Sequence, residues 1–198
     1  MARKTRLVFL DRDGTLIEER GFLSDPRGVR LVRGAAGAVE RLNRAGWAVV
    51  IVTNQSGVAR GYYSLRQMRA VNRRVVDLLR QKGAVIDAVE FCPHHPEAKR
   101  RIYRRNCSCR KPEPGMALRA ARRLGIPLRG CVAVGDRLAD VELAGRLKGA
   151  GVLVLTGYGK EHRALAEKRG LRPAAVVRDL PAAVDWILRR APRPLSRA

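Results

Sequence analysis

Three short apolar runs in this chain each lead into a polar motif, and this arrangement constrains the fold more than any other feature. The runs cover residues 7–10, 48–52 and 131–134, and the motifs after them are Asp11-Arg12-Asp13-Gly14-Thr15, Thr53-Asn54-Gln55-Ser56-Gly57 and Gly135-Asp136. Parallel strands place their carboxyl ends at one edge of a sheet. The sequence therefore predicts an α/β fold, Rossmann-like, with a mostly parallel central sheet, helices on both faces and a polar site at one sheet edge.

Alternating strand and helix patterns continue along the whole chain. We expect strands near 7–10, 47–52, 85–91, 131–134, 152–155 and 174–177, and helices near 35–44, 64–82, 114–124, 138–147 and 182–190. Ser64 with Gln67 forms a capping-box pattern, and Gly125 ends a helix. We expect a single domain over 1–190 and a basic, frayed tail over 191–198. The segment between Asp13 and the helix at 35 is too short for a large cap domain.

The charge is strongly one-sided: 41 Lys and Arg against 18 Asp and Glu give a formal net charge of +23. Such a charge attracts nucleic acid, acidic membranes or polyphosphorylated molecules. The alternative is a coding bias that places arginine on every solvated helix face. Basic residues are dense over 99–111, which predicts a positive rim on the polar site. The apolar runs are far below the roughly 18 residues of a membrane span. We expect a cytoplasmic monomer that binds neither membrane nor nucleic acid.

Asp11 and Asp13 lie two residues apart where a strand ends, so an extended backbone points both side chains to the same side, with Arg12 opposite. If a divalent cation and Lys111 keep Asp11 ionised, its carboxylate can attack phosphorus and form an aspartyl phosphate. Asp13 can then carry a proton for the leaving group. Taken alone, the motif is also compatible with a turn or a calcium loop.

The motif Asp11-Arg12-Asp13-Gly14-Thr15, the threonine after the second run, the Lys111-Pro112 pair and Gly135-Asp136 with Asp140 resemble, in order, the four motifs of the haloacid dehalogenase-like phosphatase superfamily. The resemblance implies that Asp11 is the nucleophile and Asp13 the general acid and base. It implies that Thr53 and Lys111 hold the transferring phosphoryl group, and that Asp11, Asp136 and the backbone carbonyl of Asp13 bind Mg²⁺. We expect Asp140 to orient either Asp136 or Lys111.

Four soft ligands form two close pairs: Cys92 with His94, and Cys107 with Cys109. Tetrahedral Zn²⁺ suits such a set, and with four ligands it would be structural. The sequence predicts a zinc-stabilised loop over about 91–110 that carries the cations after Cys109 to the site. His95 is the competing ligand. The alternative is a set of unrelated thiols beside a turn histidine.

The zinc pattern, together with the segment 53–61, resembles more narrowly the D-glycero-D-manno-heptose 1,7-bisphosphate 7-phosphatase branch of that superfamily. This implies a small phosphorylated sugar as substrate and contacts from Glu19, Arg20, Gly21, Phe22, Asn54, Gln55, Ser56, Arg110 and Arg137. Phe22 stands where that branch usually has tyrosine, and Arg137 where lysine is frequent. Either replacement could shift the sugar preference.

Three other functions compete with this assignment. Histidinol-phosphate phosphatases share the catalytic motifs and a related zinc loop. A DNA 3′-phosphatase would use the basic charge, but only 5% of residues are aromatic and no phosphate-binding Gly-x-x-x-x-Gly-Lys-[Ser/Thr] loop occurs. A catalytically silent nucleic-acid-binding module would have no use for the complete set of catalytic residues.

Overall fold

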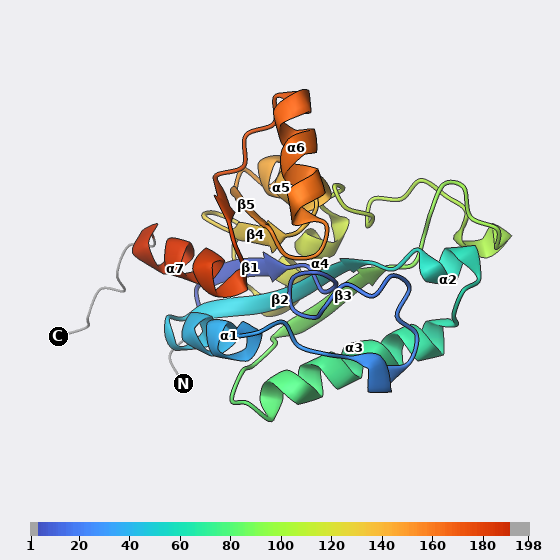
Figure 1. Cartoon of the computed structure of the whole chain (residues 1–198), viewed down its shortest axis with the longest axis horizontal. Coiled ribbons are helices and arrows are strands. Elements are labelled where there is room, and N and C mark those ends of the chain that lie inside the picture. Colours follow the sequence, from blue (N-terminus) through green and yellow to red (C-terminus); the bar gives the residue numbers. More distant parts are fainter. Residues whose placement is uncertain (1–3, 191–198) are drawn as a thin grey trace.

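A single six-stranded sheet forms the centre of the computed structural model, which describes residues 4–190 (Figure 1). All its strand pairs are parallel, in the order β3-β2-β1-β4-β5-β6. The strands are β1 (Arg6–Leu10), β2 (Trp47–Asn54), β3 (Ala88–Cys92), β4 (Val132–Gly135), β5 (Ala150–Val154) and β6 (Ala175–Val177). The predicted α/β fold is confirmed. The predicted tail over 191–198 lies outside the described residues.

Helices cover both faces of the sheet, as predicted (Figure 1). One face packs against α1 (Ala35–Arg44), α3 (Leu65–Arg80) and α7 (Leu180–Arg190). The other packs against α4 (Gly115–Leu124) and α5 (Leu138–Arg146). The remaining elements are α2 (Gly57–Arg60), α6 (Gly159–Arg169) and the 3₁₀ turns η1 (Pro26–Gly28) and η2 (Arg101–Tyr103).

Strand β1 shows why the polar residues gather at strand ends. Val8 and Leu10 lie in the core under α1, α3 and α7, whereas Leu7 and Phe9 lie in the core under α4 and α5. Because both faces are buried, every position within the strand must be apolar. The first position that can carry a carboxylate is the one after the strand.

Two helix boundaries agree with the capping residues in the sequence, whereas α3 ends at Arg80 and not near 82. Ser64 accepts from the backbone of Gln67 and the Gln67 side chain returns to Ser64, which completes the predicted capping box. Gly125 ends α4 in the left-handed conformation. β2 extends two residues beyond its predicted end, to Asn54, and β3 begins at Ala88 and not near 85.

Two helices were not predicted. α2 has only four residues, too few to show a periodic pattern. In α6 the buried residues are only Gly159 and Ala166, so the helix has no apolar stripe.

No cap domain occurs among residues 4–190: the chain between β1 and α1 forms a loop with isolated bridges at Ile17 and the single turn η1. In this part of the chain no helix is both long and apolar enough to cross a bilayer.

Candidate active site

The carboxyl ends of β1, β2 and β4 carry the predicted catalytic residues to one place. Asp11 directly follows β1, Thr53 is the next-to-last residue of β2, and Asp136 directly follows β4. These three are buried, with at most 6% of each residue exposed. Asp11 and Thr53 line a cleft of about 390 Å³, and a carboxylate oxygen of Asp136 lies within 4.8 Å of one of Asp11. The sheet edge thus forms a polar site, as expected.

Lys111 is buried among carboxylates at the bottom of this cleft. Its Nζ lies 2.9 Å from Asp11 Oδ1 and 2.6 Å from Asp140 Oδ1, and it donates to the carbonyl of Val52 over 2.8 Å. Burial alone would lower the pKa of Lys111, but the charges of Asp11 and Asp140 raise it to about 12. The lysine therefore stays charged at neutral pH. Of the two predicted roles for Asp140, the structure shows contact with Lys111.

The backbone of Lys111 is fixed by β2. Asn54 Nδ2 donates to the carbonyl of Lys111 over 3.1 Å, and the Lys111 N–H donates to Asn54 Oδ1 over 3.0 Å. Asn54 was expected to contact substrate, and it does line the cleft, but its side-chain amide uses a donor and its acceptor within the protein.

Asp13 is held by groups on two sides. The Arg12 guanidinium bonds both carboxylate oxygens, with its Nη2 2.9 Å from each, and Arg12 Nη1 donates to Asn72 over 2.7 Å. Gln55 Nε2 donates to Asp13 over 2.9 Å and to Thr53 over 2.8 Å, while Gln55 Oε1 accepts from Tyr63. Gln55, also a predicted substrate contact, therefore connects Thr53 with Asp13. Arg12 is only 1% exposed and was not predicted to take part in the site.

Asp136 is enclosed by backbone. A Cβ atom on Gly14 or Gly157 would collide with its carboxylate, and both glycines have positive φ, +73° and +53°. Oδ2 accepts from the Tyr158 N–H over 2.9 Å, whereas the buried Oδ1 has no hydrogen-bond partner among the residues that the structure describes. Burial and then the charge of Asp11 raise the pKa of Asp136 to about 8. A cation beside Oδ1 would relieve both the missing partner and the repulsion.

Most predicted substrate contacts line the cleft. Those that do are Glu19, Gly21, Phe22, Asn54, Gln55, Ser56, Arg110 and Arg137. Arg20 does not; its guanidinium lies 2.8 Å from Glu18 in an exposed pair. Phe22 is 49% exposed and packs edge-on against Tyr62, with ring centroids 4.5 Å apart.

Several lining residues were missed from the sequence: Arg60, Tyr63, Ala139, Tyr158 and His162. Tyr158 stacks under Arg137, whose Cζ lies 4.1 Å from the ring centroid, and Arg137 lies 3.7 Å from Glu19. Tyr158 and His162 belong to the N-terminal end of α6, so overlooking that helix concealed them. Arg60 could have been found from the sequence, because the Arg60-Gly61 pair closely follows the Thr-Asn-Gln-Ser motif.

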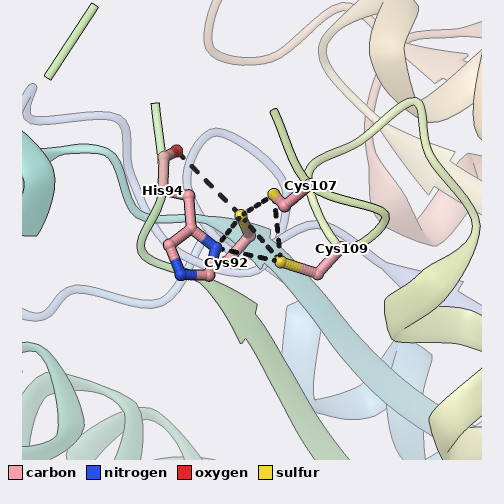
Figure 2. A group of neighbouring side chains, drawn as sticks. All are labelled: Cys92, His94, Cys107 and Cys109. Atoms are coloured by element: carbon pink, nitrogen blue, oxygen red, sulfur yellow. Dashed lines mark hydrogen bonds between the residues drawn. The ribbon is translucent and has the colours of Figure 1, made fainter. Parts of the chain in front are cut away.

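Cys92, His94, Cys107 and Cys109 form a tight group at the end of β3 and on the loop that follows it (Figure 2). Their sulfur atoms lie 3.1–3.5 Å apart, and His94 Nδ1 lies 3.7 Å from Cys92 Sγ and 3.3 Å from Cys109 Sγ. These separations are too long for disulfides and close to the roughly 3.8 Å edge of a tetrahedron of sulfur ligands around Zn²⁺. The hydrogen bond between Cys92 and Cys109 lowers the pKa of Cys109, although burial opposes this, and raises the pKa of Cys92.

His95 does not belong to this group of neighbouring side chains. Its Nε2 lies 3.2 Å from Arg60 Nη2.

Named relatives align with this chain over nearly its full length. The chain is 37% identical to D-glycero-beta-D-manno-heptose-1,7-bisphosphate 7-phosphatase of Photorhabdus laumondii, covering 91% of this chain and 95% of that protein. It is 40% identical to D-glycero-D-manno-heptose-1,7-bisphosphate 7-phosphatase of Thermosynechococcus vestitus, over 91% and 94%. The chain belongs to the heptose-bisphosphate phosphatase family.

Two further comparisons support membership of this family. A model of HAD-hydrolase-like domains matches residues 108–183. The crystal structure of D,D-heptose 1,7-bisphosphate phosphatase from B. bronchiseptica, complexed with magnesium and phosphate, superimposes with a TM-score of 0.82 at 37% identity. It covers 94% of this chain and 100% of that one. The resemblance inferred from the four motifs is therefore confirmed, and the chain is a HAD-like phosphatase.

Proposed function

We propose that this phosphatase removes the 7-phosphate of D-glycero-D-manno-heptose 1,7-bisphosphate, with Asp11 as nucleophile. The observation that carries the proposal is the contact of Asp11 with the buried, charged Lys111 beside Asp136, in a cleft whose rim carries Arg110 and Arg137. The names of the relatives, which align over more than 90% of this chain, supply the substrate. A bisphosphate fits a cleft with cations at two places.

In the first half of the reaction, an Asp11 oxygen attacks phosphorus as the bond from phosphorus to the sugar oxygen breaks. Lys111 Nζ and the Thr53 hydroxyl face the phosphoryl oxygens, where negative charge is spread in the transition state. Asp13 gives its proton to the departing sugar oxygen. The products are the Asp11 acyl phosphate and the sugar, which keeps its other phosphate.

In the second half, Asp13 takes a proton from a water molecule that attacks the phosphorus of the acyl phosphate. The bond from phosphorus to Asp11 breaks, which releases inorganic phosphate and restores the carboxylate. Arg12 and Gln55 hold Asp13 from two sides and so fix the direction from which it can act. Asp13, the acid and base, is thus held beside the nucleophile Asp11 and does not bond to Asp11 itself.

The acidic residues fit Mg²⁺. Asp11 and Asp136 offer oxygens within 4.8 Å of each other, and Asp136 Oδ1 is buried without a hydrogen-bond partner in the described part of the chain. We propose these two side chains and the Asp13 carbonyl as the protein ligands. When bound, Mg²⁺ offsets the charge of the carboxylates and the phosphoryl oxygens. Asp140 belongs to Lys111 and is not proposed as a ligand.

We propose a structural Zn²⁺ for Cys92, His94, Cys107 and Cys109. Three sulfurs and one ring nitrogen in this arrangement are a closed four-ligand set, which leaves no position for substrate. The metal would order the loop that carries Arg110 to the rim of the cleft.

A substrate panel and one variant test this assignment. Phosphate release from both anomers of the heptose bisphosphate, histidinol phosphate, fructose 1,6-bisphosphate and a 3′-phosphorylated oligonucleotide would be compared by kcat/KM. We expect kcat/KM for the better heptose anomer to exceed that of every non-heptose substrate at least tenfold. A smaller difference from those substrates would refute the heptose assignment. Asp11→Asn should abolish turnover, and acid quench of the wild type during turnover should trap phosphate on Asp11. An active enzyme without such an adduct would refute the mechanism.

A further inference from the structure

Three arginines face the same cleft, and two of them have no carboxylate partner. Arg60, Arg110 and Arg137 all line it. Arg137 pairs with Glu19 at 3.7 Å, and Arg110 Nη1 donates to the carbonyl of His94 over 3.2 Å. Among residues 4–190, no ion pair joins Arg60 or Arg110 to an acidic side chain. Such a group of like charges is costly unless an anion lies among them.

Arg60 is held in this position from outside the cleft. It is the last residue of α2, and α2 is fastened to the loop of the cysteine group by the Arg100 N–H, which donates to the Ala59 carbonyl over 3.1 Å. Arg60 Nη2 lies 3.2 Å from His95 Nε2. Its Nε is buried and has no hydrogen-bond partner in the described part of the chain. A donor therefore remains free on a guanidinium whose direction is already fixed.

The three guanidinium groups share one electrostatic environment. Arg60 and Arg137 both act on Arg110 as like charges. Arginine forks match the oxygens of a phosphate group better than any other side chain. A phosphate at this end of the cleft would satisfy donors and charges together.

We propose that Arg60, oriented by His95, joins Arg110 and Arg137 in binding the phosphate that the substrate retains. This inference rests on the proposed function in one respect, that the substrate carries two phosphates. Arg60 is then a specificity-determining residue, and His95 is a positioning residue that acts through it. The second histidine of the Cys-Pro-His-His-Pro segment thus serves the substrate, and the first serves the metal group.

The test compares two substrates that differ only in the second phosphate: heptose 1,7-bisphosphate and heptose 7-phosphate. Arg60→Gln should lower the ratio of their kcat/KM values about 10- to 100-fold, the range for a lost charge-assisted hydrogen bond. The loss should come mainly from KM of the bisphosphate. Arg60→Lys should recover part of it, because it keeps the charge without the fork. Arg66→Gln, which removes an exposed arginine of α3, is the matched control and should leave the ratio unchanged.

His95→Gln should raise KM for the bisphosphate less than Arg60→Gln does. It should add nothing in the double variant, because both changes act on one guanidinium. Zinc content, measured for each variant, shows whether the loop is intact. Equal losses on both substrates, or an unchanged ratio in Arg60→Gln with full zinc, would overturn the inference.

Failure of the proposed function can be told apart from failure of this inference. If the wild type does not prefer the heptose compounds, the same ratio would be measured with fructose 1,6-bisphosphate and fructose 6-phosphate. A selective loss on the bisphosphate would then support Arg60 as a phosphate ligand although the heptose assignment had failed. No selective loss on either sugar would overturn it.

Discussion

Arg12 lies between the two aspartates of the first motif and is almost completely buried, with 1% exposed. Its fork bonds Asp13 and its other nitrogen bonds Asn72 of α3. Buried charges are tolerated when every donor finds an acceptor. We infer that Arg12 fixes the carboxylate of Asp13 relative to Asp11. A smaller or neutral side chain has no guanidinium fork that could bond both carboxylate oxygens.

Replacing Arg12 by methionine tests this role. We expect kcat to fall about 10- to 100-fold, the usual effect when a catalytic group is displaced by about 1 Å. Stability should fall by about 1–3 kcal/mol, because Asn72 loses a buried partner. Steady-state kinetics with an aryl phosphate and denaturant unfolding measure the two effects. Arg74→Met, at an exposed position of α3, is the control; equal kcat values for both variants would contradict the role.

Residue types at strand ends and in the loop before α4 indicated which side chains gather at the site, but not how their neighbours are used. Asp11, Thr53 and Lys111 could be predicted because the chemistry needs these types at these places. The sequence predicted that Arg12 points to the opposite side from both aspartates. It gave no indication that the long side chain returns to bond Asp13. Asn54 and Gln55 were expected on the substrate, and only the structure shows that their amides hold Lys111, Thr53 and Asp13.

At the scale of elements, the turn before α6 shapes the pocket of Asp136. Gly157 has positive φ, and its missing side chain leaves room for the carboxylate and for Gly14. Gly157→Ala should displace Asp136 and raise the magnesium concentration needed for half-maximal activity about tenfold or more, as for other disturbed metal surroundings.

Gly170→Ala is the matched control for that substitution. Gly170 also has positive φ, +64°, but no atom lies within 4 Å of its absent Cβ. Both variants should therefore lose about 1–3 kcal/mol through backbone strain, whereas only Gly157→Ala should change the magnesium dependence measured by activity titration. The same shift in both variants would rule out a specific contact with Asp136.

The loop with the cysteine group should affect substrate binding more than chemistry. Lys111 contacts Val52, Asn54 and Asp140, which lie outside the loop, whereas Arg110 Nη1 donates to the carbonyl of His94 within it. Cys107→Ser should lower zinc content, reduce the free energy of unfolding by about 3 kcal/mol, as for a ligand at roughly 100 times its Kd, and raise KM more than it lowers kcat.

Elemental analysis, thermal unfolding and kinetics would follow these changes. Cys131→Ala removes a buried thiol in the core beside β4, far from the ligand set in sequence, and should retain full zinc. Zinc retained by Cys107→Ser would contradict the proposed ligand set.

Elements were predictable where a local signal exists on the chain itself. Ser64 with Gln67 and Gly125 mark helix ends through their own hydrogen bonds and backbone conformation. The helix α6 has no such apolar pattern, since most of it faces solvent. Its position depends on contacts with β5 and α5 that no pattern within the helix reveals, so the site residues Tyr158 and His162 were not assigned in advance.

At the scale of the whole molecule, the net charge of +23 should act on substrate encounter. A positive surface attracts anions in proportion to their charge, and salt screens this attraction over about 10 Å at 0.1 M. We expect kcat/KM for the bisphosphate to fall with added potassium chloride more steeply than for a monophosphate, with kcat nearly constant. Parallel slopes for the two substrates, measured at several salt concentrations, would show that the charge has no such effect.

The paired hydrogen bonds between Asn54 and Lys111 imitate one rung of a β-ladder, made by a side chain in place of a backbone. These bonds hold the backbone of Lys111 against β2. The position of Lys111 therefore does not depend on the length of the loop that precedes it. Shortening the segment between His95 and Cys107 should therefore leave Lys111 in place, provided that Asn54 is kept.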